Sequence, residues 1–346
     1  MRAGYHSPQI DVDVRLNTNE APTALPEAFD VALTEALAGI EWNRYPDRGA
    51  ANLRQKIGDR YGRSGKEVFV ANGSNEVLQT ILLTFGGAGR KAAVFEPTFA
   101  MHSQIAKTTA TTVVGGSRAD DFSLDLSEVE RVVHEHEPHV LFLCSPNNPT
   151  AVVDPPDTVD QVLEIMSGTN GLLVVDEAYG QFAETSAVDK ISNDVPMVVS
   201  RTFSKTWSMA GARLGYLLAP EWIVGELEKV VLPYHLDSFK QLAGSVALDF
   251  HEAMDAQVAL ICTERERVMT AMTELPVELW PSGANFFLFK ANRMRGDDVW
   301  QGLVDRSVLV RNTANWPGID DCLRVTIGTP AENDAFLAAL ADVLGS

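Results

Sequence analysis

Between residues 66 and 220, short apolar runs alternate with stretches in which apolar residues recur at helical spacing. The apolar runs are bounded by Gly, Pro, Asn and Asp, which favour turns at the ends of strands. Most of the runs lack polar alternation, which is typical of strands buried on both faces. The pattern therefore predicts a mostly parallel sheet covered by helices. The predicted strands are residues 68–71, 92–95, 112–114, 140–144, 172–175, 197–199 and 214–218.

The pattern changes in the last third of the chain. A helical stretch runs from about residue 242 to 275, and strand-like runs follow at 277–280, 285–289, 308–310 and 323–327 before a final helix from Pro330. Because strands no longer alternate with helices, the sequence predicts a smaller α+β domain here. We assign residues 1–35 to an N-terminal arm without a core of its own, 36–245 to a large domain and 246–346 to a small domain.

Composition narrows the classes of partner. The 346 residues are 45% hydrophobic, which is ordinary for a globular protein. A balance of 28 Lys and Arg against 47 Asp and Glu gives a net charge of −19, which argues against a nucleic-acid or anionic-membrane partner. No stretch has the length of a membrane span or a signal-peptide core, so we expect a cytoplasmic protein. The three cysteines are predicted to be buried thiols, and no metal site is predicted.

Polar side chains follow three of the predicted strands at the point where each strand ends. Asn148 follows the strand at 140–144, Asp176 ends the strand at 172–175, and Lys205 follows the strand at 197–199. Open α/β folds bind ligands at the carboxyl ends of their strands, so these side chains are predicted to lie together. An amide, a carboxylate and an amine suit pyridoxal phosphate, which binds a Lys as a Schiff base and needs a carboxylate at its ring nitrogen.

A fourth motif suits the phosphate of such a cofactor. Residues 72–76 (NGSNE) lie where the strand at 68–71 passes into a helix. Gly73 permits close approach of the backbone, and the first N–H groups of the helix favour an anion. Each motif alone is common, since a strand-end Asp is more often a cap and a Lys more often a surface charge. The four motifs together, in this order, favour a cofactor site.

With these motifs the sequence resembles the fold-type I pyridoxal-phosphate-dependent aminotransferases over nearly its whole length. The resemblance implies an α/β fold, with a large domain on a mostly parallel sheet and a smaller α+β domain. The Lys, Asp and Asn-Pro-Thr elements define the family, and the strings at 43–46 and 322–328 favour its histidinol-phosphate branch. The matching strings are 16–20 (LNTNE), 43–46 (NRYP), 73–76 (GSNE), 97–99 (PTF), 145–150 (SPNNPT), 176–179 (DEAY), 202–205 (TFSK), 213–216 (RLGY) and 322–328 (CLRVTIG).

The resemblance implies a role for each matched residue. Lys205 would attach the cofactor, Asp176 would pair with the ring nitrogen, and Phe99 would stack on the ring. Tyr179 and Asn148 would bond the phenolic oxygen. The residues expected to hold the cofactor phosphate are Gly73, Ser74, Asn75, Thr202, Ser204 and Arg213. Tyr45 would reach that phosphate from the second subunit of a homodimer with shared active sites.

The implied reaction is transamination between glutamate and imidazole-acetol phosphate, which gives histidinol phosphate in histidine biosynthesis. Lys205 would move the proton of the substrate carbon as acid and base. Arg324 matches the arginine that binds the substrate α-carboxylate. Arg311, on the preceding predicted strand, is our candidate for the substrate phosphate, with Tyr5 and Asn19 as further substrate-binding residues.

Alternatives stay open at this point. An aromatic amino-acid aminotransferase would share every cofactor residue, and a threonine-phosphate-type decarboxylase would share the fold and the phosphate recognition. A non-enzymatic protein that binds pyridoxal phosphate is disfavoured because Lys205 and Asp176 are both present. Ala21, Ala151 and Asp237 stand where the family usually has Asn, Gly and Ser, and none of these departures removes a chemical group from the predicted site.

Overall fold

The computed structural model describes residues 9–345, and a seven-stranded sheet in the order β2-β8-β7-β6-β5-β3-β4 forms the centre of its large domain. Strand β8 is antiparallel to both neighbours and the other pairs are parallel, so the predicted mostly parallel sheet is confirmed. The strands are β2 (Val68–Ala71), β3 (Lys91–Glu96), β4 (Thr112–Ser117), β5 (Val140–Cys144), β6 (Leu172–Asp176), β7 (Met197–Thr202) and β8 (Gly215–Leu218).

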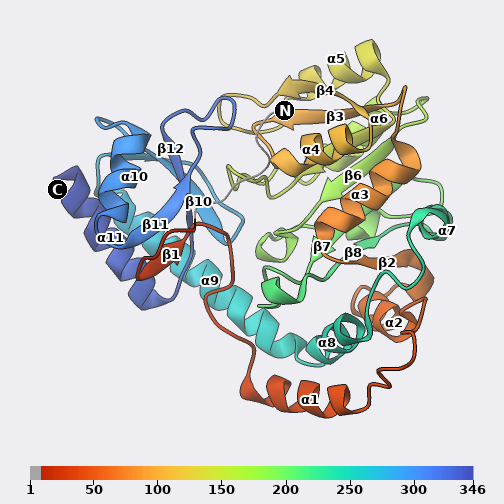
Figure 1. The fold of residues 1–346 in the computed structure, drawn as a ribbon. Helices are drawn as coiled ribbons and strands as arrows, with labels where there is room; N and C mark the ends of the chain where they lie inside the picture. The colour runs from red at the N-terminus through yellow and green to blue at the C-terminus, as the bar shows by residue number, and fades with distance from the viewer. Residues whose placement is uncertain (1–8, 346) are drawn as a thin grey trace.

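Helices cover both faces of this sheet (Figure 1). One face packs against α3 (Ser74–Phe85), α4 (Ala100–Thr108) and α7 (Glu221–Val230). The other packs against α2 (Ala51–Arg60), α5 (Leu126–His136), α6 (Thr158–Ile165) and α8 (Ser238–Leu248). Successive strand residues enter opposite cores, as Phe142 and Leu143 do in β5. Burial of both faces explains why the strands read as continuous apolar runs.

The small domain is built on a second sheet, in the order β1-β11-β12-β10-β9. Its strands are β1 (Val14–Leu16), β9 (Val277–Leu279), β10 (Phe286–Ala291), β11 (Val308–Asn312) and β12 (Cys322–Thr326), and its helices are α9 (His251–Met272), α10 (Gly296–Val304) and α11 (Pro330–Leu344). Phe286, Phe287, Phe289 and Phe336 are fully buried at its centre. In Figure 1, α9 extends from the neighbourhood of α8 into this domain.

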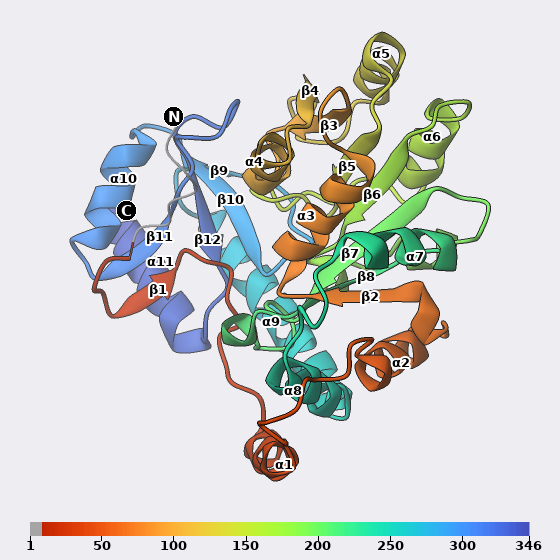
Figure 2. The same ribbon diagram turned by 45° about the vertical axis from the view of Figure 1, so that its right-hand side comes forward.

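The N-terminal segment belongs to both domains. Strand β1 pairs in parallel with β11, and Leu16 is 2% exposed in the small-domain core. Helix α1 (Glu27–Ala38) then packs beside α8, and its Phe29 joins the large-domain core (Figure 2). Helix α1 crosses our predicted boundary at residue 35 and α8 crosses the one at 245, so the division at those residues remains a proposal.

Single-turn elements and loops complete the fold. The 3₁₀ turns are Gly65–Glu67, Gly180–Phe182, Val188–Lys190 and Ala210–Ala212.

Between residues 9 and 345, no helix combines the length and the apolar character that crossing a membrane requires.

Candidate active site

A cavity of about 230 Å³ lies at the carboxyl ends of β5, β6 and β7, closed on one side by β12 of the small domain. Ala178, Met101 and Cys144 contribute apolar wall, and Thr18 comes from the N-terminal segment. The predicted site residues that line this cavity are Asn19, Ser74, Asn75, Phe99, Asn148, Asp176, Tyr179, Thr202, Ser204, Lys205, Arg213 and Arg324. The structure thus brings together side chains that lie up to 305 residues apart, as 324 − 19 gives for the outermost pair.

Lys205 follows β7 and projects its amine into the cavity. Its Nζ donates a hydrogen bond to the carbonyl oxygen of Thr18 at 3.0 Å. Burial lowers the pKa of Lys205 to about 7, and the positive charges of Arg324 and Arg213 act in the same direction, whereas Glu20 opposes them. A substantial fraction of the amine is therefore neutral near pH 7, which is the nucleophilic form.

Asp176 ends β6, and its buried carboxylate accepts two hydrogen bonds. One oxygen lies 2.9 Å from Nε2 of His102, and the other accepts from the backbone N–H of Ala178 at 3.2 Å. The His102 ring is stacked on Phe142, with centroids 4.6 Å apart, and meets Phe99 edge-on. We place the imidazole proton on Nε2, because Nδ1 has no hydrogen-bond partner among residues 9–345.

His102 was missed by our sequence prediction. It lies on α4, three residues after Phe99, and the pairing joins it to a strand residue 74 positions away. A spacing of three on a helix places His102 and Phe99 on one side, which is the signal that the sequence offers. The partner of His102, however, depends on how α4 packs on the sheet.

The start of α3 forms an anion cradle. Gly73 has a φ of +87°, and a Cβ there would lie 2.9 Å from Nη2 of Arg213. A Cβ on Gly215 would lie 2.3 Å from the backbone nitrogen of Ser74, so glycine is required on both sides of this turn. Arg213 also reaches the hydroxyl of Ser204 at 3.4 Å. The start of α3, the hydroxyls of Ser74 and Ser204 and the guanidinium of Arg213 thus line one part of the cavity, where the first N–H groups of the helix favour an anion.

A hydrogen-bonded chain connects the two domains on the other side of the cavity. Asn19 donates from Nδ2 to the Tyr179 hydroxyl at 2.9 Å, and Asn148 does so at 3.5 Å. Arg324 donates to Oδ1 of Asn148 at 2.6 Å and to the carbonyl oxygen of Asn17 at 2.9 Å. Burial raises the pKa of Tyr179 well above its usual value, so the phenol remains protonated and able to donate.

Three predicted residues, Gly73, Tyr45 and Arg311, are described by the structure but do not line the cavity. Arg311 is buried beside the cavity, directly opposite Arg324 in the antiparallel pairing of β11 with β12. Tyr45 is 79% exposed and stacks on Tyr234, with centroids 4.5 Å apart, away from this chain's own cavity. Tyr5 lies outside the described residues. Gly73 shapes the cradle with its backbone rather than lining the cavity.

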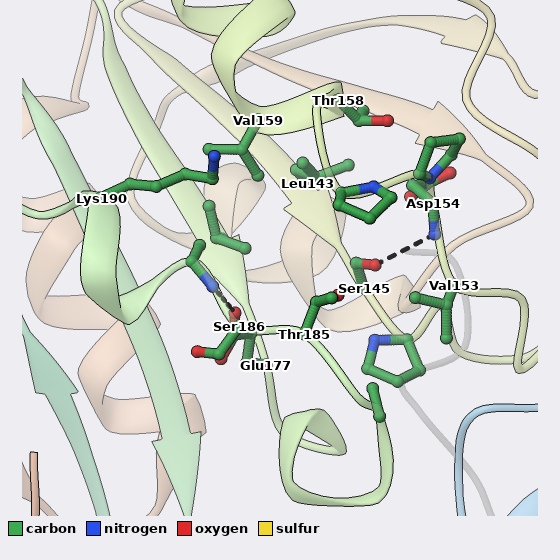
Figure 3. A pocket seen from close by; sticks show the side chains of 16 residues that line it. Leu143, Ser145, Val153, Asp154, Thr158, Val159, Glu177, Thr185, Ser186 and Lys190 are labelled. Carbon is green, nitrogen blue, oxygen red and sulfur yellow. Dashed lines mark hydrogen bonds between the residues drawn. The ribbon is translucent and has the colours of Figure 1, made fainter.

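A second hollow, of about 40 Å³, lies on the opposite face of β5 and β6 (Figure 3). Leu143 and Val175 line it, whereas Asp176, next in the chain, lines the larger cavity, because side chains alternate between the faces of a sheet. The carboxylate of Glu177 at its edge is paired with Arg201 at 2.5 Å. This hollow has room for a few water molecules but not for a cofactor.

Known proteins are similar to this chain over nearly its whole length. Residues 11–340 match the family model described as aminotransferase class I and II. A histidinol-phosphate aminotransferase of Frankia casuarinae is 43% identical, over 98% of this chain and 87% of that protein.

Two solved structures show the same fold. Histidinol-phosphate aminotransferase from Sinorhizobium meliloti, in complex with pyridoxal-5'-phosphate, has a TM-score of 0.87 at 22% identity, covering 96% of this chain and 91% of that one. L-threonine-O-3-phosphate decarboxylase from Porphyromonas gingivalis has a TM-score of 0.82 at 22% identity, covering 96% and 100%. Because proteins named for two different reactions share the fold, the fold alone does not identify the reaction.

Proposed function

The chain belongs to the class I and II aminotransferase family, and we propose that it exchanges an amino group between glutamate and imidazole-acetol phosphate to give histidinol phosphate. The observation that carries the proposal is the similarity, over nearly the whole chain, to a protein named for that activity. The site supports it by placing Arg311 and Arg324 opposite each other on neighbouring strands. Two guanidinium groups on one face of a sheet suit a substrate with a phosphate.

The cofactor of the enzyme is pyridoxal 5′-phosphate, and three features of the site fit it. Lys205 offers a neutral amine to hold the cofactor's aldehyde. Asp176, kept in place by His102, offers a buried carboxylate for the ring nitrogen. The cradle of Ser74 and Arg213 at the start of α3 fits the phosphate. When bound, the cofactor supplies an electron sink for the substrate carbon that loses a proton.

The chain's own residues orient the reactants and move the proton. With a pKa near 7, Nζ of Lys205 can accept a proton from the substrate carbon and return it close to neutral pH. The protonated Tyr179 phenol can donate a hydrogen bond to the cofactor's phenolic oxygen. Asn148 can donate to the same oxygen, because Arg324 fixes its amide by binding Oδ1. Phe99 lines the cavity next to His102 and offers an aromatic face on which the cofactor ring can stack.

The two arginines have different tasks in this proposal. Arg324 lines the cavity and binds the α-carboxylate of glutamate, or the phosphate when histidinol phosphate is bound. Arg311 lies one strand further from the cavity and contributes to the phosphate. In a chain with a net charge of −19, such local clusters of positive charge are needed to attract an anionic substrate.

We also propose that two copies form a dimer in which Tyr45 reaches the partner's cavity. The support is an exposed aromatic and aliphatic surface around the Tyr45–Tyr234 stack, where Tyr45 is 79%, Leu232 75% and Tyr234 41% exposed. Large apolar side chains gathered on one face are typical of protein–protein contacts.

Substitution of Arg311 tests the substrate assignment. Arg311→Ala should lower kcat/KM for histidinol phosphate. The loss of transition-state stabilisation should be about 2–4 kcal/mol, the scale of a lost charge-assisted contact. Arg324→Ala should be the more damaging change for glutamate. Arg293→Ala is the matched control. Arg293 is an exposed small-domain arginine, and its substitution removes the same charge away from the cavity. An Arg311→Ala enzyme that turns over histidinol phosphate like the parent contradicts the proposal.

A further inference from the structure

Trp316 lies in the loop between β11 and β12 and contacts both domains beside the cavity. Its indole Nε1 donates a hydrogen bond to the carbonyl oxygen of Thr98 at 3.2 Å. The face of its ring meets the guanidinium of Arg311, with the guanidinium carbon 5.1 Å from the ring centroid. One side chain thus contacts both the small-domain arginine and the large-domain segment that leads into Phe99.

The position of Trp316 is fixed from within its own loop. Its backbone N–H donates to the carbonyl oxygen of Thr313 at 2.8 Å, and the buried Thr313 hydroxyl donates to the carbonyl oxygen of Cys322 at 2.6 Å. The indole is 7% exposed and packs in an apolar cluster with Phe122 of the large domain and Ile319 of the loop. A buried aromatic ring held in this way cannot easily change its orientation.

The large-domain side of the contact is held as firmly. The Thr98 hydroxyl donates to Oδ1 of Asn147 at 3.1 Å, and the Thr98 backbone N–H donates to Glu96 at 3.0 Å. Asn147 precedes Asn148, which receives a hydrogen bond from Arg324. Trp316 and Arg324 therefore contact two large-domain loops that are joined to each other by the Thr98–Asn147 hydrogen bond.

The orientation of Arg311 has to be held against repulsion from Arg324. Arg311 lies directly opposite Arg324, and like charges directly opposite each other on neighbouring strands repel. The π-electron face of an indole attracts a cation and offsets that repulsion. Stacking occupies the face of a guanidinium, whereas hydrogen bonds to a phosphate use its edge, so both contacts can be made at once.

We propose that Trp316 is a positioning residue that holds Arg311 in the orientation required by the substrate phosphate, and thereby sets the preference for a phosphorylated amine over its unphosphorylated form. The inference rests on the proposed function, because it assumes that Arg311 binds this phosphate. A guanidinium already held in place loses less conformational freedom when the anion binds. Trp316 is therefore expected to strengthen binding of the phosphorylated substrate, which lowers its KM.

The test compares histidinol phosphate with histidinol, which differs from it by the phosphate alone. Trp316→Met, which removes the aromatic face, should lower the preference for histidinol phosphate by about 10-fold, through a higher KM for that substrate. Trp316→Phe keeps a ring over Arg311 and should retain the preference within about threefold. In the Arg311→Ala background, Trp316→Met should change the preference little, since the group that it positions is gone.

The outcomes separate this inference from the proposed function. Equal losses in both Trp316 variants, or a fall in kcat shared by both substrates, would mean that Trp316 serves the fold alone and would overturn the inference. If Arg311→Ala itself leaves the preference unchanged, the assignment of Arg311 fails, and the inference falls with it. Thermal unfolding is recorded for each variant, and Trp316→Leu provides the same contrast if the Met variant does not fold.

Discussion

Among residues 9–345, Asp176 has no Lys or Arg as a hydrogen-bond partner, although it is buried. Its carboxylate is held by the imidazole of His102 and by one backbone N–H. A buried carboxylate with few donors favours a positively charged partner, and the protonated ring nitrogen of the cofactor is such a partner. At the scale of single residues, the carboxylate of Asp176 is therefore expected to gain its positively charged partner when the cofactor binds.

Asp176→Asn tests that account of the carboxylate. The neutral amide keeps the shape but cannot balance a protonated ring nitrogen, so the rate of the half-reaction with histidinol phosphate should fall by about 10³-fold or more. His102→Phe is the matched variant, because it keeps the ring between Phe99 and Phe142 and removes only the donor. It should cost about 10- to 100-fold, the scale of a hydrogen bond to a charged group. A rate within tenfold of the parent for Asp176→Asn would exclude the assigned role.

The lowered pKa of Lys205 predicts a dependence of stability on pH in the cofactor-free protein. Between pH 7 and about 10.5 the unfolded chain keeps a proton on Lys205 that the folded chain has lost, so the free energy of unfolding rises with pH in this window. Relative to Lys205→Met, the parent should gain about 3–4 kcal/mol from pH 7 to 10, because its pKa is about 7 in the folded chain and about 10.5 in the unfolded chain. The comparison cancels other titrating groups. A constant difference between the two proteins would show that Lys205 is not destabilised as a cation.

At the scale of elements, the N-terminal segment is as much a part of the site as the central strands. Strand β1 joins the small-domain sheet, and the residues that follow it provide Asn17 and Asn19 to the chain of hydrogen bonds around Arg324 and Tyr179. The pairing of β1 with β11 therefore determines where these groups lie.

Leu16→Ala tests the anchoring of this segment. The side chain is 2% exposed in the small-domain core, so its truncation should lower the free energy of unfolding by about 2–4 kcal/mol. Arg15→Ala, at the exposed position before it in the same strand, should cost less than about 0.5 kcal/mol. Chemical denaturation measures both. Equal and small effects would mean that β1 is not held by its contact with the core.

The elements that the sequence predicts best are those whose environment is uniform. The runs at 140–144 and 172–175 are apolar on both faces, and β5 and β6 lie there almost residue for residue. Strand β1 was missed, because it has three residues and its partner lies 294 positions later. The helix expected at 242–275 is two helices, α8 and α9, separated at Asp249 and Phe250. Apolar spacing alone does not distinguish a continuous helix from two successive ones.

The residues of the candidate site likewise divide into those that the sequence could locate and those that it could not. Residues at the ends of predicted strands, such as Asp176 and Lys205, could be located because parallel strands deliver their ends to one edge. His102 and Trp316 could not, since their roles come from contacts across 74 and 218 positions that no local pattern encodes. The pKa of Lys205 likewise depends on charges contributed by both domains.

At the scale of the whole molecule, the exposed face around Tyr45 and the shared-site proposal make one quantitative prediction. A Tyr45→Ala chain and a Lys205→Ala chain, each impaired alone, are mixed in equal amounts and allowed to exchange subunits. About half of the dimers are then mixed, and one of their two sites carries neither change, so about a quarter of the parent activity should return. No recovery, with exchange verified by a mass tag, would mean that Tyr45 acts within its own subunit.

The central claim is that this aminotransferase site is adapted to an amine that carries a phosphate. The most direct measurement is kcat/KM of the purified enzyme with 2-oxoglutarate and, in turn, histidinol phosphate and phenylalanine. Threonine phosphate is assayed in parallel for released CO₂, because histidinol phosphate has no carboxylate to lose. We predict that histidinol phosphate exceeds phenylalanine by at least about 100-fold, in line with a loss of about 3 kcal/mol when the second anion is absent, and that no CO₂ is released. An equal or greater rate with phenylalanine would identify an aromatic amino-acid aminotransferase instead, and CO₂ release from a phosphorylated amino acid would identify a decarboxylase.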